Sequence, residues 1–274
     1  MLECNNNRVI EFYSWLNSNQ VNMQFDNKML NEKILKTQIA FYLAAKDIIS
    51  NYYPSNVIGI SLKCQPTLSE HFGVTGCTIP TFMPFGSDCE GDKKIISTTC
   101  EGDVKGLLTC CILDSLTGGK IPPLFGDLKI IEKDYIILSN CGGSSLYYAS
   151  NSNDPKLALK NLSIMPQCQG KSGAAFGYKG KSSLNSSATV ARLVRENRKY
   201  VMHLFKGEIL DTTDEMVGRI GFGNTWPHVA VRTGKSMQEF AANVASNHYC
   251  LIPGEFIFEI TKVCELFNID VLKL

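Results

Sequence analysis

Two carboxylates in the first half of the chain have the type and placement that acid–base or metal chemistry requires. Glu101 follows the short apolar run Ile95–Thr99, and Asp127 follows a second apolar stretch. We expect both side chains to lie beside strand ends, where open α/β sheets bind ligands. Each also has an ordinary interpretation, Glu101 as a residue near a helix start and Asp127 as a turn residue after a strand. The residues alone leave both interpretations open.

The histidines supply candidate partners for these carboxylates. His203 alternates with apolar strand residues and is typical of a packed side chain, whereas His71 falls in a loop. His228 follows Trp226-Pro227, a combination that suits a polar small-molecule pocket. His248 lies between a predicted helix and a strand, where histidine is usually structural, although imidazole is a common metal ligand. Two carboxylates and one histidine would form a hard donor set that suits manganese or magnesium better than zinc or copper.

Composition excludes several other function classes. The 274 residues carry a formal net charge of +1, which gives no reason to expect a nucleic acid or an anionic membrane as partner. The 11 cysteines form no CxxC pair and are typical of reduced, mostly buried thiols. Neither a membrane-spanning run nor a signal-peptide pattern occurs, so we expect a cytoplasmic location. Motifs of the GxGxxG, Walker A and GxSxG types are absent.

The elements that must position the carboxylates follow from periodicity. Up to about residue 120, helices alternate with short β-branched runs, which is the pattern of an α/β unit with parallel strands. Asp103 is a plausible N-cap for a helix that stops at Gly118-Gly119. The expected elements of this part are helices at 8–16, 31–51 and 104–116 and strands at 57–62 and 93–99.

The character of the sequence changes near residues 118–124. Helical periodicity nearly vanishes for about a hundred residues, and two runs of alternating residues, joined by the polar loop 196–199, predict a β-hairpin. The second part is therefore expected to be mainly antiparallel β-structure with helices returning near the end. Its expected elements are strands at 135–138, 189–194, 200–205, 229–231 and 271–274 and helices at 236–245 and 254–267.

Four stretches together resemble the L-fucose isomerase and L-arabinose isomerase superfamily, in particular its L-fucose isomerase-like branch. The similarity covers nearly the whole chain from about residue 8, and its most specific part is the second stretch. The stretches are QIAFYLAAKDI (38–48) with VIGISLKCQPTL (57–68), CEGDVKGLLTCCILDSLTGGKIPPLFGD (100–127), NCGG (140–143), and WPH (226–228) through ASNH (245–248) to the terminal helix.

The resemblance implies a fold and a site. It implies an α/β class, with an N-terminally incomplete Rossmann-like domain in residues 1–120 followed by a mainly antiparallel β-barrel domain with terminal helices in 121–274. It also implies that Mn²⁺ is held by Glu101, Asp127 and His248, with Glu101 and Asp127 as the catalytic residues. Substrate-binding roles are implied for Trp226, His228 and Asn247.

The implied activity is metal-dependent aldose–ketose isomerisation of a sugar through an enediolate. Members of the superfamily begin with a further α/β domain that has no counterpart in this sequence, and their active sites lie at subunit contacts. The resemblance therefore implies a homo-oligomer or a complementing N-terminal domain as partner. Two alternatives stay open: a non-catalytic carbohydrate-binding or assembly subunit that retains the isomerase fold, and a fragment without independent function.

Overall fold

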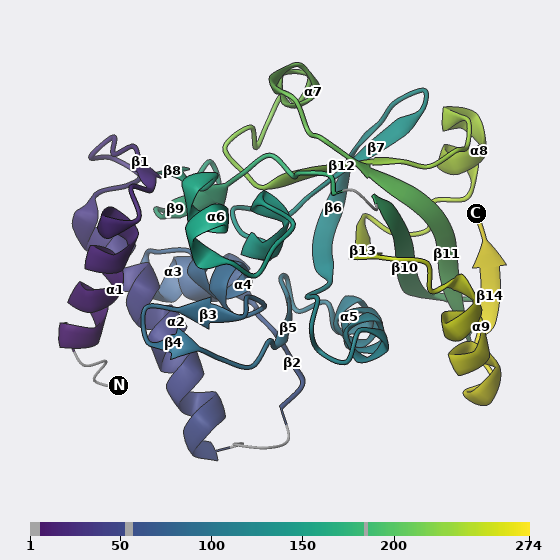
Figure 1. Cartoon of the computed structure of the whole chain (residues 1–274), viewed down its shortest axis with the longest axis horizontal. Helices are drawn as coiled ribbons and strands as arrows, with labels where there is room; N and C mark the ends of the chain where they lie inside the picture. The colour runs from purple at the N-terminus through teal and green to yellow at the C-terminus, as the bar shows by residue number, and fades with distance from the viewer. Residues whose placement is uncertain (1–5, 53–56, 184–185) are drawn as a thin grey trace.

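The computed structural model describes residues 6–52, 57–183 and 186–274, and it combines helices and strands throughout. Figure 1 shows the N-terminal helices on one side, the strands of a large sheet on the other, and α5 between them. The first part contains α1 (Asn6–Ser18), β1 (Asn22–Met23), α2 (Glu32–Tyr52), β2 (Gly59–Ser61), the turn η1 (Cys64–Leu68), α3 (Ser69–Phe72), α4 (Thr78–Phe82), β3 (Ser87–Asp88), β4 (Gly91–Asp92), β5 (Ser97–Thr99) and α5 (Val104–Leu116).

The second part begins with β6 and ends with a short strand near the C-terminus. It contains β6 (Leu124–Ile131), β7 (Tyr135–Ser139), the 3₁₀ turn η2 (Leu146–Ala149), α6 (Pro155–Lys160), β8 (Ser163–Pro166), β9 (Ala174–Gly177), β10 (Ser187–Glu196), β11 (Lys199–Leu210), α7 (Asp214–Gly218), β12 (His228–Arg232), α8 (Met237–Ala242), β13 (His248–Pro253), α9 (Ile257–Leu266) and β14 (Asp270–Lys273).

The strands β2 and β5 form a parallel pair, which the alternating pattern predicted, and α5 packs on it. A Cβ atom at Gly59 would lie 2.8 Å from side-chain atoms of Leu107 and Cys111, so glycine allows this close approach of helix and strand. Both strands are shorter than predicted. The backbone of 93–96 bonds to the loop at 83–86 instead, with Ile96 N–H donating to the Met83 carbonyl at 3.3 Å.

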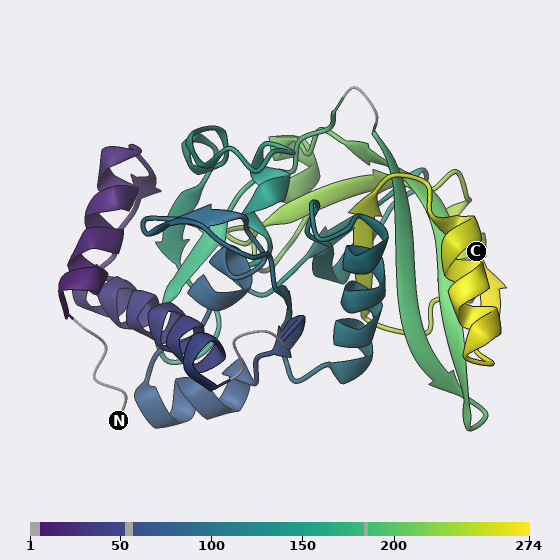
Figure 2. The ribbon, with the colours of Figure 1, turned by 60° about the horizontal axis from the view of Figure 1, so that its bottom comes forward.

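The predicted helix at 104–116 is confirmed with the same bounds. The Asp103 carboxylate accepts a hydrogen bond from Gly106 N–H at 2.9 Å, which caps the first turn. Beyond the helix, Gly118 and Gly119 both adopt left-handed backbone conformations that end it. On the other face of the helix, Leu193 N–H of β10 donates to Thr109 Oγ1 at 3.0 Å. Figure 2 shows α5 running alongside β13 and β10.

Seven strands form the main sheet, in the order β10-β13-β6-β7-β12-β11-β14. Neighbouring strands are antiparallel, except that β14 adds to β11 in parallel. An additional pairing joins β10 directly to β11, so six of these strands also pair in a closed circuit. The mainly antiparallel character expected after residue 120 is therefore confirmed.

The predicted hairpin is confirmed, but its loop is shorter than expected. Strand β10 extends to Glu196 and β11 starts at Lys199, which leaves Asn197 and Arg198 as the turn. Both turn residues have positive φ, the backbone conformation of a two-residue type I′ turn. The four-residue loop was predicted because all four residues are polar, whereas the twist of the paired strands favours the tighter turn.

Residues 150–183 contain structure that the polar composition did not predict. Strands β8 and β9 pair with each other, and β8 also pairs in parallel with β1 of the N-terminal part. Helix α6 starts at an Asp154 cap and a proline in its first turn. The terminal helices α8 and α9 exist but are shorter than predicted, and Phe267 lies beyond α9 with 72% of its surface exposed.

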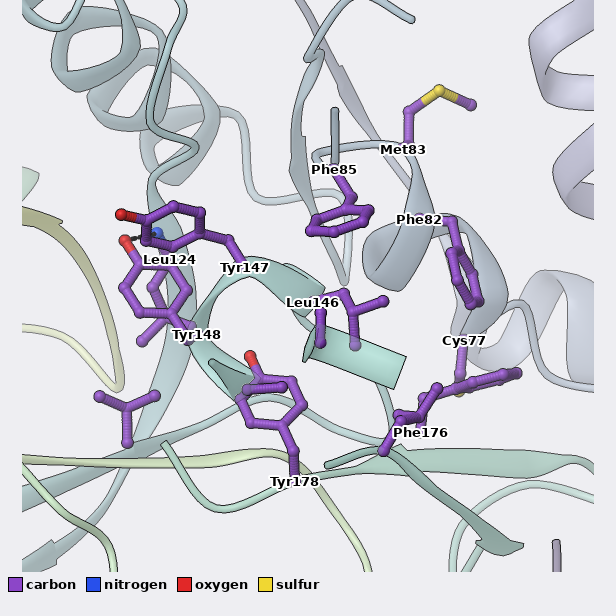
Figure 3. Packing of buried hydrophobic residues seen from close by; sticks show 14 of the residues in the cluster. Cys77, Phe82, Met83, Phe85, Leu124, Leu146, Tyr147, Tyr148, Phe176 and Tyr178 are labelled. Carbon is purple, nitrogen blue, oxygen red and sulfur yellow. Dashed lines mark hydrogen bonds between the residues drawn. The ribbon is translucent and has the colours of Figure 1, made fainter. Parts of the chain in front are cut away.

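One buried apolar cluster contains residues from both parts of the chain. Figure 3 shows Leu146 among the rings of Phe82, Phe85, Phe176 and Tyr178. The rings of Phe82 and Phe176 meet edge to face, with centroids 5.9 Å apart. The cluster includes Leu124 of β6 and Tyr249 of β13. In the described ranges the cysteines are free, and helices long and apolar enough to cross a membrane do not occur.

Candidate metal centre

Asp127 and His248 lie directly opposite each other on the adjacent antiparallel strands β6 and β13. Directly opposite residues place their side chains on the same face of a sheet. His248 Nε2 accordingly lies 3.3 Å from Asp127 Oδ1. The interpretation of Asp127 as a turn residue beside a strand end was wrong, because it lies in the middle of β6, where Gly126 and the strand pairing continue the extended backbone.

Glu101 reaches the same point from the turn between β5 and α5. Its φ is +61° and that of Gly102 is +68°, so two successive left-handed residues fold the chain sharply after the strand. A non-glycine residue in this conformation is strained, and such strain concentrates at functional sites. The turn brings Glu101 Oε2 to 3.5 Å from His248 Nε2, while 44% of the Glu101 side chain remains exposed.

The three side chains fit a hard divalent cation. Their ligand atoms all lie within 4.8 Å of one another. An ion about 2.1 Å from each ligand brings neighbouring ligand atoms to roughly 3 Å from each other in octahedral geometry. The distances from His248 Nε2 to Asp127 Oδ1 and Glu101 Oε2, 3.3 and 3.5 Å, are close to this value. Among the described residues, the buried Nε2 of His248 has no hydrogen-bond partner, although it faces both carboxylates. Two carboxylates and an imidazole are donors that Mn²⁺ and related ions accept.

The local charge favours a cation at this point. Burial opposes a charged imidazole, but the carboxylates of Asp103, Asp127 and Glu101 outweigh this effect and raise the pKa of His248 to about 11. Asp127 is buried and accepts a hydrogen bond from Asn247 Nδ2 at 2.5 Å. Asn247 therefore contacts a candidate ligand directly and fixes one carboxylate oxygen.

Trp226 and His228 lie apart from the three candidate ligands. They line a cavity of about 230 Å³ together with Tyr178 and Lys179, and the candidate ligands are absent from its lining. His228 is opposite Ser139, which is in turn opposite Asp127, so His228 shares the row of the site but lies two strands away. At the usual strand spacing this is roughly 10 Å.

Trp226 and His228 are both buried and have polar neighbours. His228 is only 1% exposed, and burial lowers its pKa to about 4, so its imidazole is neutral near pH 7. Trp226 Nε1 donates to Gln167 Oε1 at 2.6 Å. The ammonium of Lys129 lies 4.4 Å from the centre of the Trp226 ring. Because Lys129 is only two positions after Asp127, it links the two regions.

Sequence reasoning missed three charged groups near the site. Asp103 was identified only as a helix cap, yet its Oδ2 lies 2.8 Å from His248 Nδ1. Arg192, on β10, pairs with Asp103. Lys129 lies in β6 between Leu128 and Ile130, where the pairing with β7 shifts register. Proximity to Glu101 was the only available signal for Asp103, and Arg192 had none.

Comparison with known proteins gives one family match. The family described as L-fucose isomerase, C-terminal domain, matches residues 138–274, which is half of the chain. The match includes Trp226, His228, Asn247 and His248 and begins after Glu101 and Asp127. No curated protein matches the chain.

Proposed function

The chain belongs to the family of the L-fucose isomerase C-terminal domain, and from this membership we propose that it is a metal-dependent aldose–ketose isomerase or the catalytic part of one. The observation that carries the proposal is the convergence of Glu101, Asp127 and His248, whose ligand atoms lie within 4.8 Å of one another. The proposed ion is Mn²⁺, and the proposed substrate is a sugar with a free carbonyl group.

A division of the chain is part of the proposal. Residues 1–120 would form a Rossmann-like domain, supported by the parallel pair β2–β5 and the helix α5 that follows it. Residues 121–274 would form the antiparallel barrel, supported by the closed circuit of six strand pairings. In this arrangement Glu101 belongs to the first domain, while Asp127 and His248 belong to the second.

The proposed chemistry assigns a task to each side chain. A divalent ion held by the three ligands would polarise two neighbouring sugar oxygens, which acidifies the proton on C2. One carboxylate would take that proton and return it to C1, while the other moves the hydroxyl proton. Glu101 is the more exposed carboxylate and lies on the open side of the site. Asp127 is fixed by Asn247 and would hold its position during the transfer.

The substrate would extend from the ligands toward Trp226. Lys129 lies between the two regions, because it follows Asp127 in sequence and its ammonium contacts the indole ring. Trp226 and His228 would form the far wall, and Asn247 the near one. A second copy of the chain or a complementing N-terminal domain would cover the side on which Glu101 is exposed.

The test is conversion of aldoses to ketoses by the purified protein. With Mn²⁺ and a panel that includes L-fucose and L-arabinose, ketose should accumulate, and EDTA should stop it. Glu101→Gln should lower the rate by a factor of about 10²–10⁴, the usual contribution of an acid–base group. Asp134→Asn, at an exposed turn residue, is the matched control and should retain full activity.

Two results would count against isomerase activity. One is the absence of ketose from every sugar, also when the N-terminal domain of an L-fucose isomerase is added in trans. The other is sugar binding that persists in Glu101→Gln without any turnover in the wild type. The second result would favour a carbohydrate-binding or assembly subunit that retains the fold.

A further inference from the structure

A third carboxylate lies behind the imidazole of His248. Asp103 Oδ2 is 2.8 Å from His248 Nδ1, on the opposite edge of the ring from Nε2. Nε2 is the atom that faces Glu101 and Asp127. Asp103 therefore contacts the ring from the far side and is not placed as a fourth ligand.

Three further contacts hold this carboxylate in place. Arg192 donates from Nη1 to Oδ2 at 2.6 Å and from Nη2 to Oδ1 at 3.1 Å, a two-pronged ion pair that fixes the plane of the carboxylate. Gly106 N–H donates to Oδ1 at 2.9 Å. The ion pair is buried, with 5% of the Arg192 side chain and 10% of the Asp103 side chain exposed.

Gly106 in the first turn of α5 leaves room for the ion pair between Asp103 and Arg192. A Cβ atom at Gly106 would lie 2.8 Å from Arg192 Nη1 and 2.9 Å from Asp103 Oδ2, so only glycine allows the close approach. Asp103 thus joins the start of α5, strand β10 and strand β13 at one point. A carboxylate that accepts from the outer ring nitrogen of a metal-binding histidine fixes the ring orientation and tautomer.

We propose that Asp103, fixed by Arg192, is a positioning residue of the metal centre, which holds the proton of His248 on Nδ1 and directs Nε2 toward the ion. The inference rests on the proposed function, because it needs the metal that the isomerase would use. Arg192 also balances the charge of Asp103. The negative charge next to the cation therefore comes from two carboxylates, Glu101 and Asp127, because the charge of the third is neutralised by Arg192.

The first experiment measures Mn²⁺ affinity by calorimetry in the wild type and in Asp103→Asn. Asparagine is as good an N-cap as aspartate, so the start of α5 keeps its cap while the charged acceptor of His248 is lost. The dissociation constant should rise about 10–100-fold. Asp154→Asn is the matched control, because Asp154 caps the remote helix α6 in the same way, and its affinity should stay within about twofold of the wild type.

The second experiment needs no variant. In the Co²⁺-loaded wild-type protein, the Nδ1 proton of His248 should give a hyperfine-shifted NMR resonance that is present in H₂O and absent in D₂O. The inference would be overturned if the Co²⁺-loaded wild type showed no such resonance. It would also be overturned if folded Asp103→Asn bound Mn²⁺ with unchanged affinity. A chain that binds Mn²⁺ as described here yet isomerises no sugar would refute the proposed function alone. A wild type that binds neither ion would refute both.

Discussion

Helix α5 carries an aspartate near each end, and the two should respond to charge removal in opposite ways. Asp103 caps the N-terminus, where a negative charge is favourable. Asp114 lies in the last turn, where a negative charge is unfavourable, and its Oδ1 is buried with no hydrogen-bond partner in the part of the chain that the structure describes. Burial raises the pKa of Asp114 to about 6, and Lys94 offsets this only in part. We predict that Asp114→Asn stabilises the protein at pH 7.5.

The pKa shift gives the size of this effect. A rise of about two units above the ordinary value corresponds to roughly 3 kcal/mol, and partial exposure to solvent reduces the expected gain to about 1–2 kcal/mol. A carboxyl group whose pKa is raised by folding contributes stability below its unfolded pKa and loses it as pH rises through the folded pKa. The advantage of Asp114→Asn should therefore be absent below about pH 4, grow through pH 6 and level off above pH 7.

Urea unfolding of both proteins between pH 4 and pH 8 measures this difference. Asp134→Asn, in an exposed turn, is the control and should give no pH-dependent gain. A gain that does not vary with pH would mean that the amide packs better and that the charge of Asp114 has no effect. Equal stability at pH 7.5 would show that the carboxylate is solvated, contrary to the reasoning from its burial.

Three further predictions concern the metal, the ligand contacts and the core. Mn²⁺ at a hundred times its dissociation constant should raise the free energy of unfolding by about 2.7 kcal/mol, which a thermal-shift assay detects as a higher Tm. EDTA should reverse the gain, and a shift that persists in His248→Gln would place the ion elsewhere. Asn247→Ala removes a hydrogen bond to Asp127 and should weaken Mn²⁺ binding about tenfold by calorimetry, whereas unchanged affinity would make that contact dispensable. Phe82→Ala deletes a fully buried ring and should cost about 3–5 kcal/mol in urea unfolding. Phe258→Ala, at a ring that is 69% exposed, should change stability by less than about 0.5 kcal/mol, and similar losses in both would contradict the burial argument.

The parts of the fold that the sequence predicts are those with local causes. Helix α5 has its cap and its glycine stop within a few residues of its ends, and its bounds were predicted correctly. The β10–β11 hairpin also depends on neighbours in the chain. Strand β8 was not predicted, because it is only four residues long and one of its partners, β1, is far away in sequence. The polar composition around β8 favours a loop, and its pairings with β9 and with β1 make it a strand.

The site depends on pairings that local patterns cannot specify. His248 and Asp103 are 145 positions apart, and their contact requires both the β6–β13 register and the packing of α5 on β10. A one-residue slip in that register would turn His248 to the other face of the sheet. The candidate ligands were therefore identified through their resemblance to a family, and their convergence rests on the fold.

Asp103 shows why a positioning residue stays hidden in a sequence. Its role as a helix cap already explains an aspartate at that position, so no unexplained feature pointed to a second role. The two roles are compatible because the carboxylate divides its oxygens: Oδ1 accepts from Gly106 N–H, and Oδ2 faces His248. Arg192 contacts both oxygens and prevents the side chain from rotating to serve one role at the expense of the other. If that reasoning holds, Arg192→Lys should weaken Mn²⁺ binding although it conserves charge, because a lysine cannot form the two-pronged contact.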